Sequence, residues 1–192
     1  MKDFTADVVL KVKIMLCFVA ILWAVEIVNL VFGYELNRFG IIPRDITGLR
    51  GLIFSPFLHG SINHLVLNTG PLFILGLLVI SRGIGAFLLL TFMVSIIGGF
   101  GVWSFGQASS VHIGASGVVF SYFGYLLFKG LFDKKLKALL VSLGVFIIYG
   151  SIIWGVFPGT AGISWEGHLF GFLAGVAWAY WTRHKEPILS NN

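Results

Sequence analysis

The sequence contains few charged residues. Asp, Glu, Lys and Arg make up only 11% of its 192 residues, whereas 57% are hydrophobic and the mean hydropathy is +0.95. A soluble globular domain carries about 25% charged residues. The shortage therefore excludes an ordinary soluble domain and indicates a membrane protein. No polar linker or internal repeat divides the chain, so we expect one membrane domain over residues 1–192.

Two further absences restrict the possible bonds and partners. Cys17 is the only cysteine, so no disulfide can form within the chain. The net charge is +5, yet no basic patch lies beside polar surface, and we expect no nucleic-acid partner. In a membrane protein, an excess of basic residues is better explained by topology.

Long apolar segments dominate the sequence. A helix needs about 20 mostly apolar residues to cross the hydrocarbon layer. The first such segment is long, contains the bulky Trp23 and is followed by no small-residue cleavage pattern, so it is predicted to remain as a helix. We therefore predict an all-α fold of six transmembrane helices. These cover approximately 14–33, 61–81, 84–103, 115–129, 137–157 and 166–182.

The basic residues predict the orientation of these helices. Only Arg38, Arg44 and Arg50 fall on one side of the predicted membrane. By the positive-inside rule the opposite side, with both termini, is cytoplasmic. The long outer segment 34–60 mixes apolar and charged residues, as an interfacial element would. The basic residues on the cytoplasmic side are Lys2, Lys11, Lys13, Arg82, Lys129, Lys134, Lys135, Lys137, Arg183 and Lys185.

Polar residues inside the predicted spans share one depth. Such residues are costly in a membrane and usually face the interior of a bundle. At a rise of 1.5 Å per residue, Asn68, Ser116 and His168 each lie roughly 20 Å from the basic residue that marks the cytoplasmic end of their span. In a core about 30 Å thick, all three therefore lie roughly 10 Å below the outer surface. His64 is four residues before Asn68, so on a helix both share one face.

Small residues predict that two of these spans pack closely. Gly117, Ser121 and Gly124 form a stripe at helical spacing, and Gly171 and Gly175 form a second stripe after His168. Such stripes let helix backbones approach each other. Packing them together would bring Ser116 near His168.

Each polar residue also has an ordinary structural interpretation. A serine between glycines can serve packing alone, and a lone intramembrane histidine more often bonds a neighbouring helix. His59 is predicted to be structural, whereas loop organisation and substrate contact are equally open for His112. Glu26 and Asn29, one helical turn apart in the first span, are expected to bond the first loop or a neighbouring span, because an isolated carboxylate there would be expensive. The role of Glu166 stays open.

Missing motifs exclude several kinds of intramembrane chemistry. There is no His-Glu-x-x-His pattern for a zinc protease, and every aspartate lies outside the spans, which excludes a paired-carboxylate site. The soluble-hydrolase elbow is missing because Val118 stands where it needs glycine. A Ser116–His168 pair remains, in which the imidazole takes the hydroxyl proton during attack. His64, Asn68 and the Ser116 backbone N–H could stabilise the resulting negative charge.

These residues resemble the rhomboid intramembrane serine proteases. The resemblance covers nearly the whole chain, with each motif on the second, fourth or sixth span. The matching elements are LRG at 49–51, His59-x4-His64-x3-Asn68, GASG at 114–117 and His168-x2-Gly171-x3-Gly175.

The resemblance implies a function and a role for each site residue. Ser116 would be the nucleophile, His168 the general base, and His64 and Asn68 the oxyanion hole. The substrates would be transmembrane proteins in the lipid bilayer, cut near their outer ends without a cofactor or metal. The short termini suggest the minimal bacterial form, in the cell (inner) membrane. The residues with supporting or packing roles would be His59, Gly114, Gly117, Gly171 and Gly175.

Two other functions compete with this one. A catalytically silent relative would bind client helices without cutting them, but its signature is loss of the serine or histidine, and both are present. A small transporter would need polar residues that continue to the cytoplasmic side, whereas the spans below Asn68 and Ser116 are mainly apolar. The sequence does not indicate an oligomeric state.

Overall fold

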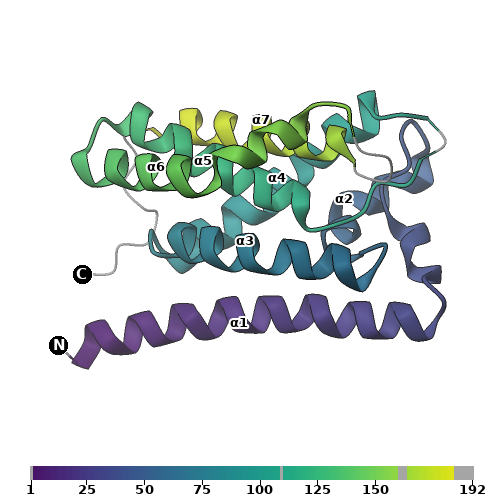
Figure 1. Ribbon diagram of the computed structural model, residues 1–192, viewed down its shortest axis with the longest axis horizontal. Coiled ribbons are helices and arrows are strands. Elements are labelled where there is room, and N and C mark those ends of the chain that lie inside the picture. Colours follow the sequence, from purple (N-terminus) through teal and green to yellow (C-terminus); the bar gives the residue numbers. More distant parts are fainter. Residues whose placement is uncertain (1, 109, 160–163, 184–192) are drawn as a thin grey trace.

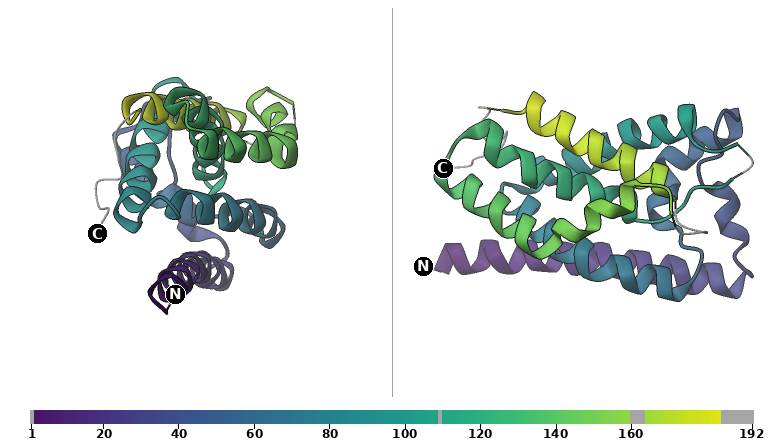
Figure 2. Two further views of the ribbon diagram at one scale, coloured as in Figure 1. Left: turned by 90° about the vertical axis from the view of Figure 1, so that its left-hand side faces the viewer. Right: turned by 45° about the horizontal axis from the view of Figure 1, so that its top comes forward.

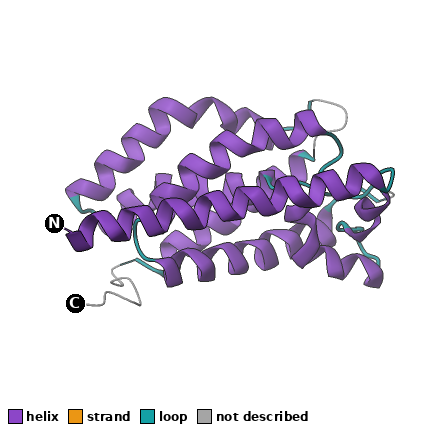
Figure 3. Cartoon of the chain, turned by 90° about the horizontal axis from the view of Figure 1, so that it is seen from below, coloured by secondary structure: helices purple, strands orange, loops and turns teal. Residues whose placement is uncertain are grey.

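The computed structural model describes residues 2–108, 110–159 and 164–183. Regular secondary structure in these ranges is helical (Figure 3), apart from one isolated antiparallel bridge between Ile41 and His112. This agrees with the predicted all-α class. Lys185, which was used to predict the topology, lies outside the described residues.

Six long helices in the described ranges lie side by side, and successive ones run in opposite directions (Figure 1). They correspond in order to the six predicted spans. The helix bounds are α1 Lys2–Val31, α3 Ile62–Ile80, α4 Ile84–Phe105, α5 Ser116–Asp133, α6 Leu136–Tyr149 and α7 Trp165–Trp181.

Two elements differ from the predicted spans. Helix α1 begins at Lys2 rather than near residue 14, because the charged segment before the apolar run is also helical. An ion pair of 2.6 Å between Asp7 and Lys11 joins successive turns of this extension. The fifth predicted span is an α-helix only as far as Tyr149. It continues as a 3₁₀ helix over Gly150–Val156.

Four of the helical segments in the described ranges are long and apolar enough to cross a membrane. Helix α5 has 18 residues but includes Lys129 and Asp133, and α7 has only 17 residues. The integral-membrane character is therefore supported, while the count of six spans stays a prediction. The four segments are Phe4–Val31, Ile62–Ile80, Ile84–Phe105 and Leu136–Val156.

Helix α1 lies at the edge of the molecule, as the end-on view shows (Figure 2). Among the long helices it packs chiefly against α3. The Trp23 indole donates a hydrogen bond of 3.2 Å to the Thr69 hydroxyl across this contact. Near the other end of α1, the buried Asn29 side chain bonds Asn37 at 2.9 Å and thereby holds the first loop. The expectation that this polar end of the span contacts the first loop is confirmed for Asn29.

The first loop consists of short helical turns that dock on the end of α4. Asp45 accepts a hydrogen bond of 2.7 Å from the Thr47 backbone, and the Trp103 indole donates to the Asp45 carbonyl at 2.7 Å. The Thr47 hydroxyl and backbone N–H both lower the pKa of the Asp45 carboxyl. Arg44 donates to the carbonyls of Ser104, in the last turn of α4, and of Gly106, which follows this helix. The turns are 3₁₀ helices Glu35–Phe39, Ile46–Arg50 and Ser55–Phe57, with α2 over Gly51–Phe54.

Helices α5 and α7 form the most extensive contact between two helices of the fold. A Cβ added at Gly171 would overlap the carbonyl oxygen of Gly117, and one added at Gly175 would overlap that of Ser121. The Ser121 hydroxyl donates across the same contact to the Gly171 carbonyl, at 2.8 Å. The close approach predicted from the two small-residue stripes is therefore present.

Charged and polar groups join the same helices at the end opposite the first loop. The buried Lys129 ammonium donates to the Thr182 carbonyl at 2.5 Å and pairs with Asp133 at 2.9 Å. Arg82, in the turn between α3 and α4, lies 3.5 Å from the other Asp133 oxygen. These contacts hold α5, α7 and the α3–α4 turn together.

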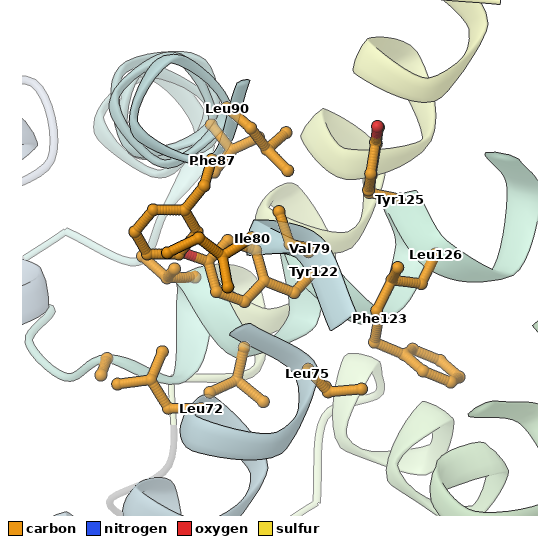
Figure 4. Close-up of a cluster of buried hydrophobic side chains, with 14 of the residues drawn as sticks. Leu72, Leu75, Val79, Ile80, Phe87, Leu90, Tyr122, Phe123, Tyr125 and Leu126 are labelled. Carbon is orange, nitrogen blue, oxygen red and sulfur yellow. The ribbon is translucent and has the colours of Figure 1, made fainter. Parts of the chain in front are cut away.

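Between the two ends, the interior is filled by apolar side chains from α3, α4 and α5 (Figure 4). Leu72, Leu75, Leu90, Tyr122 and Phe123 are all at most 1% exposed. The Tyr122 hydroxyl is paired with the Thr91 hydroxyl at 2.6 Å, so this polar group is satisfied inside the core. Among the described residues, the cluster drawn in Figure 4 is therefore mainly apolar.

The contact between α5 and α7 generates a stability prediction. In Gly175→Ala the added methyl would meet the Ser121 backbone, and such overpacking typically costs about 1–3 kcal/mol. Gly144→Ala is the matched control, because it lies in α6 with no atom within 4 Å of the added Cβ. Thermal melts in detergent should show a lower Tm for Gly175→Ala and a Tm at or above the parent's for Gly144→Ala. Equal melting of the two variants would contradict the close approach.

Candidate active site

Three helices begin at the same end of the molecule, next to the first loop (Figure 1). His64 is the third residue of α3, Ser116 the first residue of α5 and His168 the fourth residue of α7. The connectivity of the chain thus places three predicted site residues in the first turns of three helices that run in the same direction.

These three residues line one cavity of about 590 Å³. Its walls come from the starts of α3, α5 and α7 and from the loops that precede α5 and α7. Ser116 is half-buried, whereas His168 is only 8% exposed. The cavity is therefore lined by the Ser116 hydroxyl, the His64 imidazole and the His168 imidazole. Of these, His168 has restricted access to water.

Two glycines show how closely the elements around Ser116 and His168 approach each other. A Cβ added at Gly117, the residue after Ser116, would lie 3.5 Å from the carbonyl oxygen of Gly167, the residue before His168. A longer side chain at position 117 would push apart the two helices that carry the pair. The glycine after the candidate nucleophile therefore has a packing function as well.

The loop before Ser116 is fixed by hydrogen bonds to its backbone. The Gly114 N–H donates to the Ser55 carbonyl at 2.9 Å, and the Ala115 N–H donates to Nε2 of His59 at 3.2 Å. Gly114 has φ +119°, a conformation that L side chains rarely adopt. The chain can therefore turn into α5 at this point only because residue 114 is glycine.

The absence of a side chain at Gly114 also leaves space next to both His64 and Ser116. A Cβ added at Gly114 would lie 3.0 Å from Nε2 of His64 and 3.5 Å from Oγ of Ser116. The His64 ring and the Ser116 hydroxyl therefore lie on either side of the space that the missing side chain leaves. An alanine at this position would fill that space.

His59 is completely buried and bonds the loop that carries Ser116. Its Nε2 accepts a hydrogen bond from the Ala115 N–H and is therefore unprotonated, so the ring is neutral. Burial, with a smaller effect from the neighbouring His64 ring, lowers the pKa of His59 to about 4. The ring centroids of the two histidines are 5.2 Å apart. His59 therefore acts as a neutral support for this loop.

The environment of His168 fixes its tautomer. Its Nδ1 lies 2.9 Å from the Gly155 carbonyl oxygen, which can only accept a hydrogen bond. Nδ1 therefore carries the proton in the neutral ring, and Nε2 keeps a free lone pair for accepting another. The Phe120 ring stacks on the imidazole with centroids 4.1 Å apart and planes 6° apart, which restricts rotation of the imidazole.

Gly155 and Phe120 were not predicted from the sequence. A Cβ at Gly155 would lie 3.1 Å from Nδ1 of His168 and 2.8 Å from the Phe120 ring, so only glycine fits there without displacement. Phe120 lies four residues after Ser116, on the same face of α5, and this spacing could have indicated it. Gly155 lies in a 3₁₀ turn, where no periodic pattern points toward His168.

Asn68 is placed differently from the other predicted site residues. It is buried one turn below His64 on α3, and its side-chain amide donates to the His64 carbonyl at 2.9 Å. It is not among the residues that line the cavity. One N–H of the amide stays available for another acceptor. The structure therefore brings His64, Ser116 and His168 together and leaves Asn68 behind this layer.

The start of α5 offers further hydrogen-bond donors. The first backbone N–H groups of a helix lack partners within the helix, and no side chain caps this end. The positive end of the helix dipole therefore lies beside the Ser116 hydroxyl. A negatively charged oxygen at this position would be stabilised by these N–H groups.

Glu166 bonds the loop between α4 and α5. Its Oε1 accepts a hydrogen bond of 3.2 Å from the Gln107 backbone N–H. This contact answers the question that the sequence left open, since the carboxylate holds the loop that leads to Ser116. Among the described residues, no group of three or more His, Cys, Asp or Glu side chains could hold a metal ion.

Comparison with known proteins places this arrangement in a family. The model of the Rhomboid domain matches residues 47–185. An uncharacterized protein of Mycobacterium tuberculosis (strain ATCC 25618 / H37Rv) is 41% identical over 173 residues, covering 86% of this chain and 72% of that protein. A Bacillus subtilis (strain 168) protein provisionally named the rhomboid protease YdcA is 32% identical over 130 residues, covering 65% and 62%. The chain therefore belongs to the Rhomboid family.

Proposed function

We propose that this protein is an intramembrane serine endopeptidase that cuts transmembrane helices near their outer ends. The observation that carries the proposal is the cavity shared by Ser116, His168 and His64 at the start of three helices. Family membership supports the same reaction class. The proposal includes six spans with both termini cytoplasmic, in a bacterial cell membrane. The relatives from Mycobacterium and Bacillus are in keeping with that location.

The proposed reaction begins with Ser116. Its oxygen attacks the carbonyl carbon of the scissile peptide bond while Nε2 of His168 takes the hydroxyl proton. The other proton stays on Nδ1, which donates its hydrogen bond to the Gly155 carbonyl oxygen, and this contact stabilises the imidazolium that forms. His168 then gives the first proton to the leaving amine, and an ester to Ser116 remains. Water, deprotonated by His168, hydrolyses this ester and restores the hydroxyl.

The tetrahedral intermediates need donors for their negative oxygen. The backbone N–H groups at the start of α5 and the His64 ring are next to the Ser116 hydroxyl. We assign Asn68 to the same task, in which its amide would donate its free N–H or turn away from the His64 carbonyl. Of the proposed donors, Asn68 therefore needs the largest movement of its side chain when the substrate binds.

The position of the cavity supports a cut near the outer end of the substrate. It adjoins the first loop, which contains all three basic residues that the topology places outside. Below it, the core around Leu72, Tyr122 and Phe123 is packed and mainly apolar. This core argues against a transporter. A silent client-binding relative would keep the cavity but would not need the bond that fixes the tautomer of His168.

The first test removes either half of the pair. Ser116→Ala and His168→Ala should each abolish cleavage of a model transmembrane substrate by protein purified in detergent, and the double variant should lose no more than either single one. Mass mapping of the products from the parent should place the cut in the outer half of the substrate helix. If Ser116→Ala turns over at the parent rate, the nucleophile is wrongly assigned. A parent that binds the substrate without cutting it would favour the silent relative.

The second test separates the oxyanion donors from the pair. His64→Ala and Asn68→Ala should lower kcat by about 10²–10³, the usual cost of losing one such donor. Both variants should still react with a serine-directed fluorophosphonate, whereas Ser116→Ala should not. Thermal melts must accompany the rates because Asn68 is buried. Variants that melt and cleave like the parent would show that these side chains are structural.

The third test concerns topology. Reporter fusions after residues 45 and 107 should read outside the cell, and fusions after residues 82, 134 and 188 should read inside, because the basic residues favour the cytoplasm. Helices α5 and α7 are the decisive cases in this experiment, because neither is among the four described segments that are long and apolar enough to cross a membrane. Equal readings after residues 107 and 134 would mean that α5 does not cross the membrane.

A further inference from the structure

His112 lies at the junction of the elements that carry Ser116 and His168. It is four residues before Ser116, only 6% exposed, and lines the cavity. Its backbone pairs with Ile41 of the first loop through bonds of 2.9 and 3.0 Å. Both nitrogens of its ring lie within 2.8 Å of a serine hydroxyl. A buried imidazole with two short hydrogen bonds has one fixed orientation.

The protons of this network can be assigned from the chemistry of its partners. The Ser110 hydroxyl donates its single hydrogen to the Gln107 carbonyl, at 2.6 Å. Ser110 must therefore accept from Nε2 of His112, which lies 2.8 Å away. In the neutral ring, Nδ1 is then unprotonated. It accepts the hydrogen of the Ser164 hydroxyl, at 2.6 Å.

Ser164 connects this ring to His168. It is the N-cap of α7, where its hydroxyl oxygen accepts from the Gly167 N–H at 3.1 Å. Its carbonyl accepts from the His168 backbone N–H at 3.2 Å. One serine thus donates to the loop before Ser116 and accepts from the backbone of the turn that contains His168. With Nδ1 of His112 as the acceptor, the Ser164 hydroxyl donates across the junction while its oxygen caps α7.

The surroundings keep His112 in this neutral form. Burial lowers its pKa, and the nearby Glu166 carboxylate and the Gln107 backbone carbonyl oppose this effect only in part. Glu166 itself bonds Gln107 of the same loop. The loop and the α7 turn are thus joined twice, and the His112–Ser164 bond is the contact nearer to Ser116 in the chain.

We propose that His112 is a positioning residue, which aligns His168 with Ser116 by accepting the Ser164 hydroxyl hydrogen at Nδ1. The proposal rests on the proposed protease function and assigns the residue a role within it. Ser116 and His168 lie on separate helices, so their relative position depends on contacts between the segments that precede them. A misplacement of about 1 Å can cost roughly 10²-fold in rate. The residue would therefore act on kcat without touching the substrate carbonyl.

Two substitutions at this position separate the two ring nitrogens. In His112→Asn the side-chain oxygen can reach the position of Nδ1 and accept from Ser164, but nothing reaches Ser110. In His112→Gln the longer amide can reach Ser110 and leaves Ser164 without its acceptor. Ser164→Gly removes the hydroxyl from the other side, and glycine is the N-cap replacement that costs a helix least.

The experiment measures kcat, KM and Tm of these variants on a model transmembrane substrate in detergent, with Ser116→Ala as the inactive reference. His112→Gln and Ser164→Gly should each lower kcat by about 10- to 100-fold, with KM within about threefold of the parent and Tm nearly unchanged. His112→Asn should retain most of kcat. The double variant His112→Gln with Ser164→Gly should be no slower than the slower single variant, because both changes remove the same bond between His112 and Ser164.

Each other outcome overturns the assignment. Equal kcat for His112→Asn and His112→Gln would show that the Ser164 bond has no special role. If His112→Gln does not fold, Ser164→Gly decides alone, and a parent-like kcat in that variant contradicts the proposal. Losses that follow Tm and add up in the double variant would indicate a purely structural residue. If the parent cleaves no better than Ser116→Ala, the proposed function fails first and the positioning role fails with it.

Discussion

The contact between the backbones of α5 and α7 is the constraint on which the site depends. Glycine at positions 124, 171 and 175 allows carbonyl oxygens of one helix to lie where the other would otherwise carry a methyl group. Ser116 and His168 are therefore separated by the width of two backbones, rather than by two layers of side chains. In a membrane, where apolar helix surfaces gain little by leaving the lipid, close packing of this kind is also what holds helices together. The same residues thus stabilise the fold and set the geometry of the pair.

Much of this arrangement follows from the sequence because it is periodic. The spacing of Ser121 after Gly117, and of Gly175 after Gly171, defines helix faces directly. The common depth of Ser116 and His168 follows from counting residues along straight helices. The start of α1 was harder to predict, because its charged first turns have no apolar signal. Its helicity rests on local contacts such as the pair of Asp7 and Lys11.

The parts of the site that sequence reasoning missed lie where the backbone is irregular. Gly155 reaches His168 from a 3₁₀ turn, and the direction of such a turn depends on packing rather than on a repeat. The bonds of His112 depend on how a loop folds against the first turn of another helix. Asn68 was expected at the cavity from its helix face and depth. Its amide instead bonds the carbonyl one turn earlier on its own helix, a local contact that always competes with longer-range ones.

Helix α7 is anchored at one end, where the buried Lys129 of α5 binds it. Its last turn is tied to α5 through the Thr182 carbonyl, so the helix can tilt about that point more easily than it can slide. His168 lies roughly 20 Å along the helix from this anchored end. A tilt of only about 3° would therefore displace the imidazole by about 1 Å, a distance that matters for reaction geometry. A tilt too small to disturb the apolar core would therefore change the position of the imidazole at the far end of the helix.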